Sequence, residues 1–133
     1  MSSAEGKSWI RARVLALAGE GPVSVLDIGP GVGTYAKLLA GPALSRIVGV
    51  EVWQPYVETY RLHEYYDDIV LGDARQVDLP VADVVILGDV AEHMTEGEAL
   101  RLWGRCAEAA RRAVYLSIPI VHYPQQEIEG NPY

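Results

Sequence analysis

Residues 25–35 read VLDIGPGVGTY, an apolar run that carries one carboxylate and leads directly into three glycines spaced G-x-G-x-G. The apolar run is typical of a strand that is buried on both faces of a parallel sheet. Glycines let the chain turn sharply and let a ligand lie against the backbone, while the next helix offers its free N–H groups. The segment therefore predicts a site for a nucleotide-sized ligand at the end of the first strand.

Strands and helices alternate on both sides of this segment. Apolar runs predict strands at residues 23–28, 46–52, 69–71, 81–87 and 113–118, and helical spacing or capping signals predict helices at residues 8–18, 34–40, 54–64 and 95–112. This order predicts an α/β fold: a Rossmann-like, doubly wound, mostly parallel sheet of about five strands with helices on both faces. The length of 133 residues fits a single domain, residues 1–133.

Composition and charge restrict the expected partners. Half of the residues are hydrophobic and 22% are charged, as in folded proteins. The net charge of −7 opposes binding to a phosphate backbone, so we expect a small molecule rather than a nucleic acid. The sequence shows no membrane span and no secretory signal. Cys106 is the single cysteine, so no internal disulfide can form, which indicates a reducing cytoplasm.

Two acidic residues follow the glycine segment at informative positions. Glu51 lies 20 residues after Gly31, at the expected end of the second strand, where a carboxylate can accept hydrogen bonds from both hydroxyls of a ribose. Asp73 follows the third strand, where it can accept a hydrogen bond from the adenine amino group. Thr34 stands where the dinucleotide fingerprint requires glycine or alanine, which disfavours an NAD-type oxidoreductase domain.

Residues 20–120 resemble the class I S-adenosylmethionine-dependent methyltransferases, on the glycine segment, the acidic segments at 48–51 and 72–74, and the strand exit at 83–89. The resemblance implies S-adenosyl-L-methionine as the cofactor and S-adenosyl-L-homocysteine as its product. It assigns the amino-acid end to the glycine segment and its acid, the ribose to the second strand end, and the adenine to the third. The residues it places at the cofactor are Asp27, Gly29, Pro30, Gly31, Gly33, Glu51, Val52, Trp53, Asp73, Ala74 and Asp89.

The segment after the fourth strand, residues 88–94, reads GDVAEHM and in the resembled family faces the transferred methyl group. If this segment is helical, Asp89, Glu92 and His93 share one face. His93 is then the candidate catalytic base that removes the proton of the acceptor, with Glu92 orienting it. The segment is more similar to that of small-molecule O- and C-methylating members than to the Asn-Pro-Pro-Tyr motif of DNA-methylating enzymes.

Two alternatives remain open. Metal-dependent RNA 3′-terminal 2′-O-methyltransferases use Glu-x-x-Glu-His and a later histidine, and Asp89, Glu92, His93 and His122 resemble that set. The aspartate in place of the first glutamate and the acidic composition disfavour this alternative, so we expect no metal. Alternatively, the domain binds the cofactor without turnover. His122 and Tyr123 are weaker candidates for lining an acceptor pocket.

The last residues differ from the resembled family, which adds an antiparallel pair of strands after the fifth. Residues 121–133, with Pro124 and Pro132, cannot supply that pair. We therefore expect either a domain truncated at its C-terminus or a homo-oligomer. In the second case the exposed apolar edge of the strand at 113–118 pairs with another copy, because open edges of this kind are usually covered.

Overall fold

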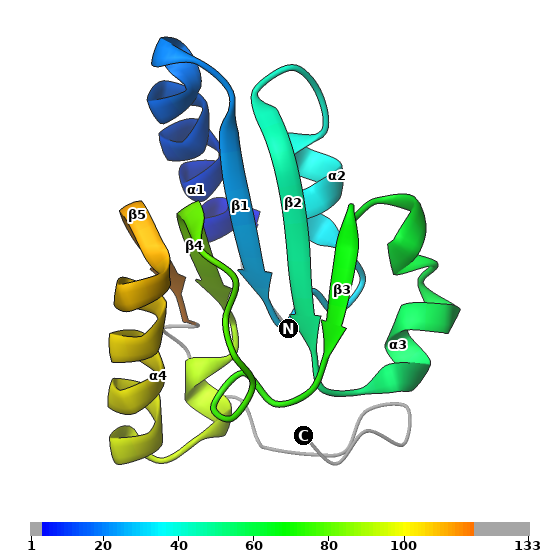
Figure 1. Cartoon of the computed structure of the whole chain (residues 1–133), viewed down its shortest axis with the longest axis vertical. Coiled ribbons are helices and arrows are strands. Elements are labelled where there is room, and N and C mark those ends of the chain that lie inside the picture. The colour runs from blue at the N-terminus through cyan, green and yellow to red at the C-terminus, as the bar shows by residue number, and fades with distance from the viewer. Residues whose placement is uncertain (1–3, 119–133) are drawn as a thin grey trace.

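A computed structural model describes residues 4–118. Five parallel strands form one sheet in the order β3-β2-β1-β4-β5, and Figure 1 shows their carboxyl ends pointing in the same direction. The strands are β1 (Val23–Ile28), β2 (Leu44–Glu51), β3 (Asp68–Leu71), β4 (Ala82–Gly88) and β5 (Ala110–Ser117). The chain leaves β1 toward one side of the sheet and returns on the other at β4, and open α/β sheets bind ligands at such a switch point.

Helices cover both faces of the sheet, as the sequence predicts (Figure 1). The helices are α1 (Ala4–Leu17), α2 (Thr34–Leu39), α3 (Gln54–Thr59) and α4 (Glu96–Ala109). On one face, α1, α2 and α3 bury residues such as Val14 and Leu39. On the other face, α4 buries Leu102 and Cys106 against β1, β2 and β4. The predicted Rossmann-like fold is confirmed.

The predicted helix over residues 54–64 is wrong in its second half. Helix α3 ends at Thr59, Arg61 has a left-handed backbone with φ 53°, and a short 3-10 turn, η2 (Leu62–Glu64), follows. The break lets Leu62 become fully buried and brings the hydroxyl of Tyr66 to β1. These tertiary contacts outweigh the helix propensity of the local sequence.

Helix α4 begins where the capping signal predicts and ends earlier than expected. The hydroxyl of Thr95 accepts a hydrogen bond from the backbone N–H of Glu98, and the Glu98 side chain bonds back to Thr95, which completes a capping box. The helix ends at Ala109, and β5 begins at the next residue because Ala110 already pairs with β4. Within residues 4–118, no helix is long and apolar enough to cross a membrane.

Candidate functional site

The glycine segment forms a tight loop at the end of β1. Gly29, Gly31 and Gly33 have φ values of 70°, 56° and 84°, a backbone region that favours glycine. A Cβ atom on Gly29 would lie 2.6 Å from Cγ2 of Val90, so this loop contacts the segment after β4. The loop therefore has no space for a side chain at its first turn, and it leaves the backbone open to a ligand.

Glu51 connects the glycine loop to the end of β2. Its side chain is buried, and its Oε1 accepts a hydrogen bond from the backbone N–H of Gly31 at 3.3 Å. Oε2 accepts from the backbone N–H of Trp53 at 2.8 Å. Burial raises the pKa of Glu51, and the two backbone hydrogen bonds act in the opposite direction. An ionised carboxylate has about four lone-pair sites, so acceptor capacity remains for the hydroxyls of a ligand.

Asp27 lies beneath the glycine loop at the end of β1. It is only 1% exposed, and the hydroxyl of Tyr66 donates a short hydrogen bond to its Oδ2. Burial raises the pKa of Asp27 to about 7, with the Tyr66 hydrogen bond opposing the rise and the charge of Glu51 adding to it. Sequence reasoning missed Tyr66, because its position depends on the break after α3.

Asp73 lies after β3 in the loop that leads to β4, and Arg75 occupies most of its side chain. Oδ1 accepts hydrogen bonds from the backbone N and from Nε of Arg75, each at 2.9 Å, and Oδ2 accepts from Nη2 at 2.6 Å. These hydrogen bonds hold the pKa of Asp73 below its usual value. The Arg75 guanidinium also pairs with Glu98 of α4. Arg75 was not predicted, although a basic residue two positions after an acid could have indicated the pair.

The segment after β4 is not an α-helix. The prediction that Asp89, Glu92 and His93 share one helix face is therefore wrong. Asp89 has a left-handed backbone with φ 54°, and only a 3-10 turn, η3 (Ala91–His93), follows. Lys7 of α1 lies 3.4 Å from Oδ2 of Asp89. His93 is 47% exposed, and its Nε2 lies 3.6 Å from Oε1 of Glu92, which is too long for a direct hydrogen bond.

Two buried carboxylate oxygens near this segment lack donors. Oδ1 of Asp89 and Oε2 of Glu92 have no hydrogen-bond partner within residues 4–118. Burial raises the pKa of Glu92, and the nearby charge of Asp89 adds to the rise. A buried acceptor without a donor costs about 1–3 kcal/mol, so a ligand with N–H or O–H groups would be stabilised here.

Metal ligation by the Asp89, Glu92 and His93 set finds no support in the described part of the chain. No group of three or more His, Cys, Asp or Glu residues in this part is arranged to hold a metal ion. His122 and Tyr123, the other candidates of the sequence, lie outside the described residues. The alternative of a metal-dependent RNA methyltransferase therefore gains nothing from the geometry.

Backbone hydrogen bonds hold the ends of β1, β2 and β3 together. The N–H of Gly29 donates to the carbonyl of Val50 at 2.9 Å, and the N–H of Gly72 donates to the carbonyl of Glu51 at 2.9 Å. Ile28 pairs with Leu87 of β4 on the other side. The predicted residues of the first three strand ends thus meet at one edge of the sheet. Val52 and Trp53, at least partly exposed, follow β2 directly at this edge.

Comparison with known proteins identifies the family to which the chain belongs. A family described as a methyltransferase domain matches residues 26–115, from within β1 into β5. The chain belongs to the methyltransferase domain family. No curated protein sequence matches this methyltransferase domain.

Solved methyltransferase structures share the fold. Magnesium protoporphyrin IX methyltransferase from Synechocystis PCC 6803, with bound S-adenosylmethionine, is 24% identical over 84% of this chain and 56% of that chain, with a TM-score of 0.71. CalS10, an amino pentose methyltransferase from Micromonospora echinaspora, is 20% identical over 95% of this chain and 54% of that chain, with a TM-score of 0.71. This methyltransferase domain thus spans about half the length of the structures it matches.

Proposed function

We propose that this domain binds S-adenosyl-L-methionine and takes part in transfer of its methyl group to a small-molecule acceptor. The observation that carries the proposal is the Glu51 carboxylate, which is buried at the end of β2 and hydrogen-bonded to the glycine loop at Gly31. A ribose bound there would lie beside the Asp73 loop, which has a charged acceptor for adenine. Related structures were solved with S-adenosylmethionine or S-adenosylhomocysteine bound, which supports the same ligand here.

The residues of this edge would divide the work as follows. Glu51 would bind the ribose, Asp73 and Ala74 the adenine, and Asp27 with the glycine loop the amino-acid end. When bound, the cofactor supplies a methyl group attached to a positively charged sulfur. After the methyl group is transferred, the sulfur remains in a neutral thioether, which is the leaving group. The acceptor would lie at the β4 exit near Asp89, where buried carboxylate oxygens of Asp89 and Glu92 have no hydrogen-bond donor within residues 4–118. His93, half exposed, would take the proton of the acceptor and release it to solvent.

Calorimetric titration with S-adenosylhomocysteine tests the adenine contact. Asp73→Ala removes the acceptor of the N6 amino group, and loss of a hydrogen bond to a charged group costs about 1.5–3 kcal/mol, or roughly ten- to a hundredfold in Kd. Asp78→Ala, an exposed acid of the same loop, is the matched control and should bind as the unmutated protein does. Equal affinity of both variants would contradict the assignment of Asp73 to the adenine.

A second measurement distinguishes an enzyme from a cofactor-binding module. Binding of the cofactor without methyl transfer to any acceptor would indicate such a module.

We also propose that a second copy pairs along β5. Among the described strands, β5 pairs only with β4, so its outer edge is open. Leu116 is 42% exposed on this strand and Ile118, just beyond it, is 50% exposed. Open apolar edges invite pairing with another strand. Light scattering at micromolar concentration should give the mass of a dimer or a larger assembly, and a monomeric mass would contradict the proposal.

A reducing compartment such as the cytoplasm is the setting that we propose. Cys106 is fully buried beneath α4, and burial raises the pKa of its thiol to about 11. The thiol therefore stays protonated and fills space in the core rather than forming a disulfide.

A further inference from the structure

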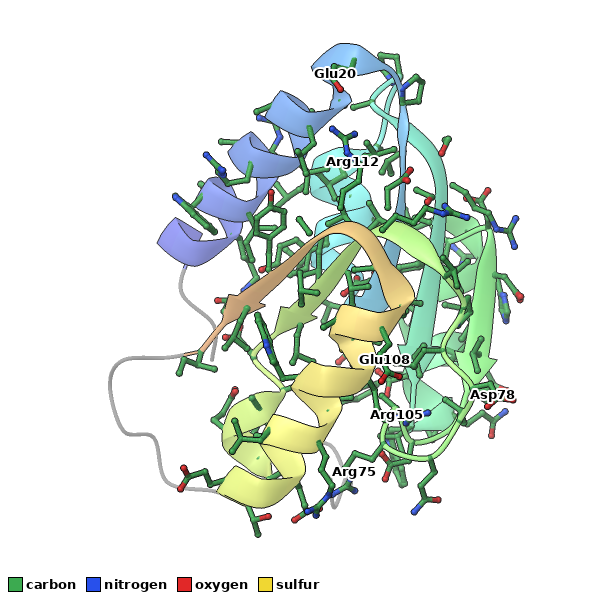
Figure 2. All side chains as sticks on the ribbon, turned by 60° about the vertical axis from the view of Figure 1, so that its left-hand side comes forward. Glu20, Arg75, Asp78, Arg105, Glu108 and Arg112 are labelled. Carbon is green, nitrogen blue, oxygen red and sulfur yellow. The ribbon has the colours of Figure 1, made fainter. Side chains whose placement is uncertain are left out.

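Two arginine side chains join α4 to the loop that follows β3. Arg105 of α4 donates through Nη1 to the carbonyl of Ala74 and through Nη2 to the carbonyl of Val77. In the opposite direction, Arg75 of the loop pairs with Glu98 near the start of α4. Figure 2 shows Arg75 and Arg105 in the space between the helix and the loop. Helix α4 thus holds the loop at three points.

The loop segment from Asp73 to Val77 is a compact turn, which explains why it needs this contact. The N–H groups of Gln76 and Val77 donate to the carbonyl of Asp73 at 2.8 and 2.9 Å. The later carbonyls of such a turn, here those of Ala74 and Val77, have no hydrogen-bond donor within the turn. A buried carbonyl needs a donor, so one must come from another part of the protein. The planar fork of a guanidinium can serve two such carbonyls at once, whereas an ammonium is a single point.

Val77 is also fixed from the other side of the turn. A Cβ atom on Gly72, which has φ 152°, would lie 2.5 Å from Cγ1 of Val77, so the turn folds closely back on the end of β3. Ala74 belongs to the apolar core beneath α4, and the partly buried Val77 packs against this core. A shift of the turn would therefore change the position of Asp73 relative to β3.

The orientation of Asp73 decides which donor it can accept. Each carboxylate oxygen accepts two hydrogen bonds from Arg75, and the longest of the four joins Nε to Oδ2 at 3.1 Å, so this is the bond that an adenine amino group would most easily replace. The positive charge of Arg105 is near enough to contribute to the ionised state of Asp73, after the larger contribution of Arg75. Arg105 therefore acts on Asp73 through both the turn and its charge.

We propose that Arg105 is a positioning residue for the adenine end of the cofactor: it holds the Asp73–Val77 turn against α4 so that Asp73 can recognise the adenine amino group. The proposal rests on the proposed function, because it assumes that adenine binds at Asp73. Arg105 donates to two backbone carbonyls of the turn, and the proposal gives it no direct contact with the cofactor. Loss of Arg105 should therefore reduce the preference for an adenine ligand more than it reduces the stability of the fold.

Two ligands that differ only in the base measure this choice. S-Adenosylhomocysteine carries an N6 amino donor, whereas S-inosylhomocysteine carries an oxygen there, which the carboxylate of Asp73 would repel. We expect the unmutated protein to prefer the adenine ligand by about tenfold in calorimetric Kd, because the oxygen of the hypoxanthine base would face a carboxylate with no hydrogen between them. In Arg105→Lys the preference should fall below about threefold, because one ammonium cannot serve both carbonyls.

Arg101→Lys provides the matched control. Arg101 is exposed one turn earlier on α4, and its replacement should leave both affinities unchanged. A hollow of about 420 Å³, lined in part by Arg75, Arg101 and Arg105, lies beside the contact and gives the shorter lysine room and access to water. Within residues 4–118, Arg101 makes no hydrogen bond to the loop, which is why it serves as the control. Thermal unfolding of both variants checks that the fold is kept.

Glu98→Gln gives a second variant if Arg105→Lys fails to fold. The glutamine keeps the capping box with Thr95 but removes the charge that pairs with Arg75, so the preference for adenine should fall about two- to threefold. An unchanged preference in the folded Arg105→Lys variant, or in Glu98→Gln where that variant is unfolded, overturns the proposal. Absence of S-adenosylhomocysteine binding by the unmutated protein would overturn the proposed function instead.

Discussion

Replacing Glu51 with glutamine is expected to weaken binding of S-adenosylhomocysteine by about a hundredfold, since two hydrogen bonds from ribose hydroxyls to a charged acceptor contribute about 3 kcal/mol or more. The substitution also changes the contacts that Glu51 makes within the protein. Glu51 accepts from the N–H groups of Gly31 and Trp53, and a glutamine would present its own NH₂ to one of them. With the NH₂ facing Gly31, the glycine loop would lose this hydrogen bond to β2 and keep the one from Gly29 to the carbonyl of Val50.

Calorimetry on Glu51→Gln and on Glu108→Gln measures this effect. Glu108 is an exposed residue of α4, and the same chemical change there should leave the affinity as it is. If both variants bind as tightly as the unmutated protein, Glu51 does not hold the ribose. If Glu51→Gln alone loses affinity while its thermal unfolding stays cooperative, the assignment stands.

Replacing Asp27 with asparagine is expected to remove much of the pH dependence of folding stability. The unfolded carboxyl loses its proton near 3.8, whereas burial raises the pKa of the folded Asp27 to about 7. Between these values the folded protein binds the extra proton, so the free energy of unfolding falls as pH rises and levels off above about 7. The difference corresponds to roughly 4 kcal/mol over the whole interval. Asparagine has no charge to bury and can still accept the hydrogen bond from Tyr66.

Chemical denaturation at pH 5.5 and pH 8.0 tests this expectation. Relative to the unmutated protein, Asp27→Asn should gain roughly 2 kcal/mol in free energy of unfolding between the two pH values. Asp78→Asn removes an exposed carboxyl and should follow the unmutated protein at both. A constant difference between Asp27→Asn and the unmutated protein would show that Asp27 is already ionised in the folded state at pH 5.5.

The strand ends and their acids could be predicted because each depends on a local pattern. An apolar run that ends with an acid beside it places Asp27, Glu51 and Asp73 at one edge of a parallel sheet, whatever the other side chains around them are. The residues that hold these acids depend on tertiary contacts. Tyr66 reaches Asp27 only because the helix breaks at Arg61, and Arg105 reaches the loop after β3 from a helix that follows β4.

The backbone conformation at the β4 exit could not be predicted from the sequence, for a different reason. Asp89, Glu92 and His93 have the spacing of a helix face, yet the left-handed backbone of Asp89 ends that possibility at the first residue. An aspartate tolerates this conformation, so nothing in its type distinguishes the two outcomes. Its N–H donates to the carbonyl of Ser117 in β5 at 2.7 Å, a contact between distant segments that no local pattern reveals.

A crystal structure with S-adenosylhomocysteine tests the central claim most directly. We expect one ligand at the carboxyl edge, with its ribose hydroxyls within hydrogen-bond distance of the Glu51 carboxylate and its adenine amino group at Oδ2 of Asp73. The amino-acid end should lie against the loop from Gly29 to Gly33. A ligand bound elsewhere, or a crystal soaked at saturating concentration with this edge still empty, would contradict the claim.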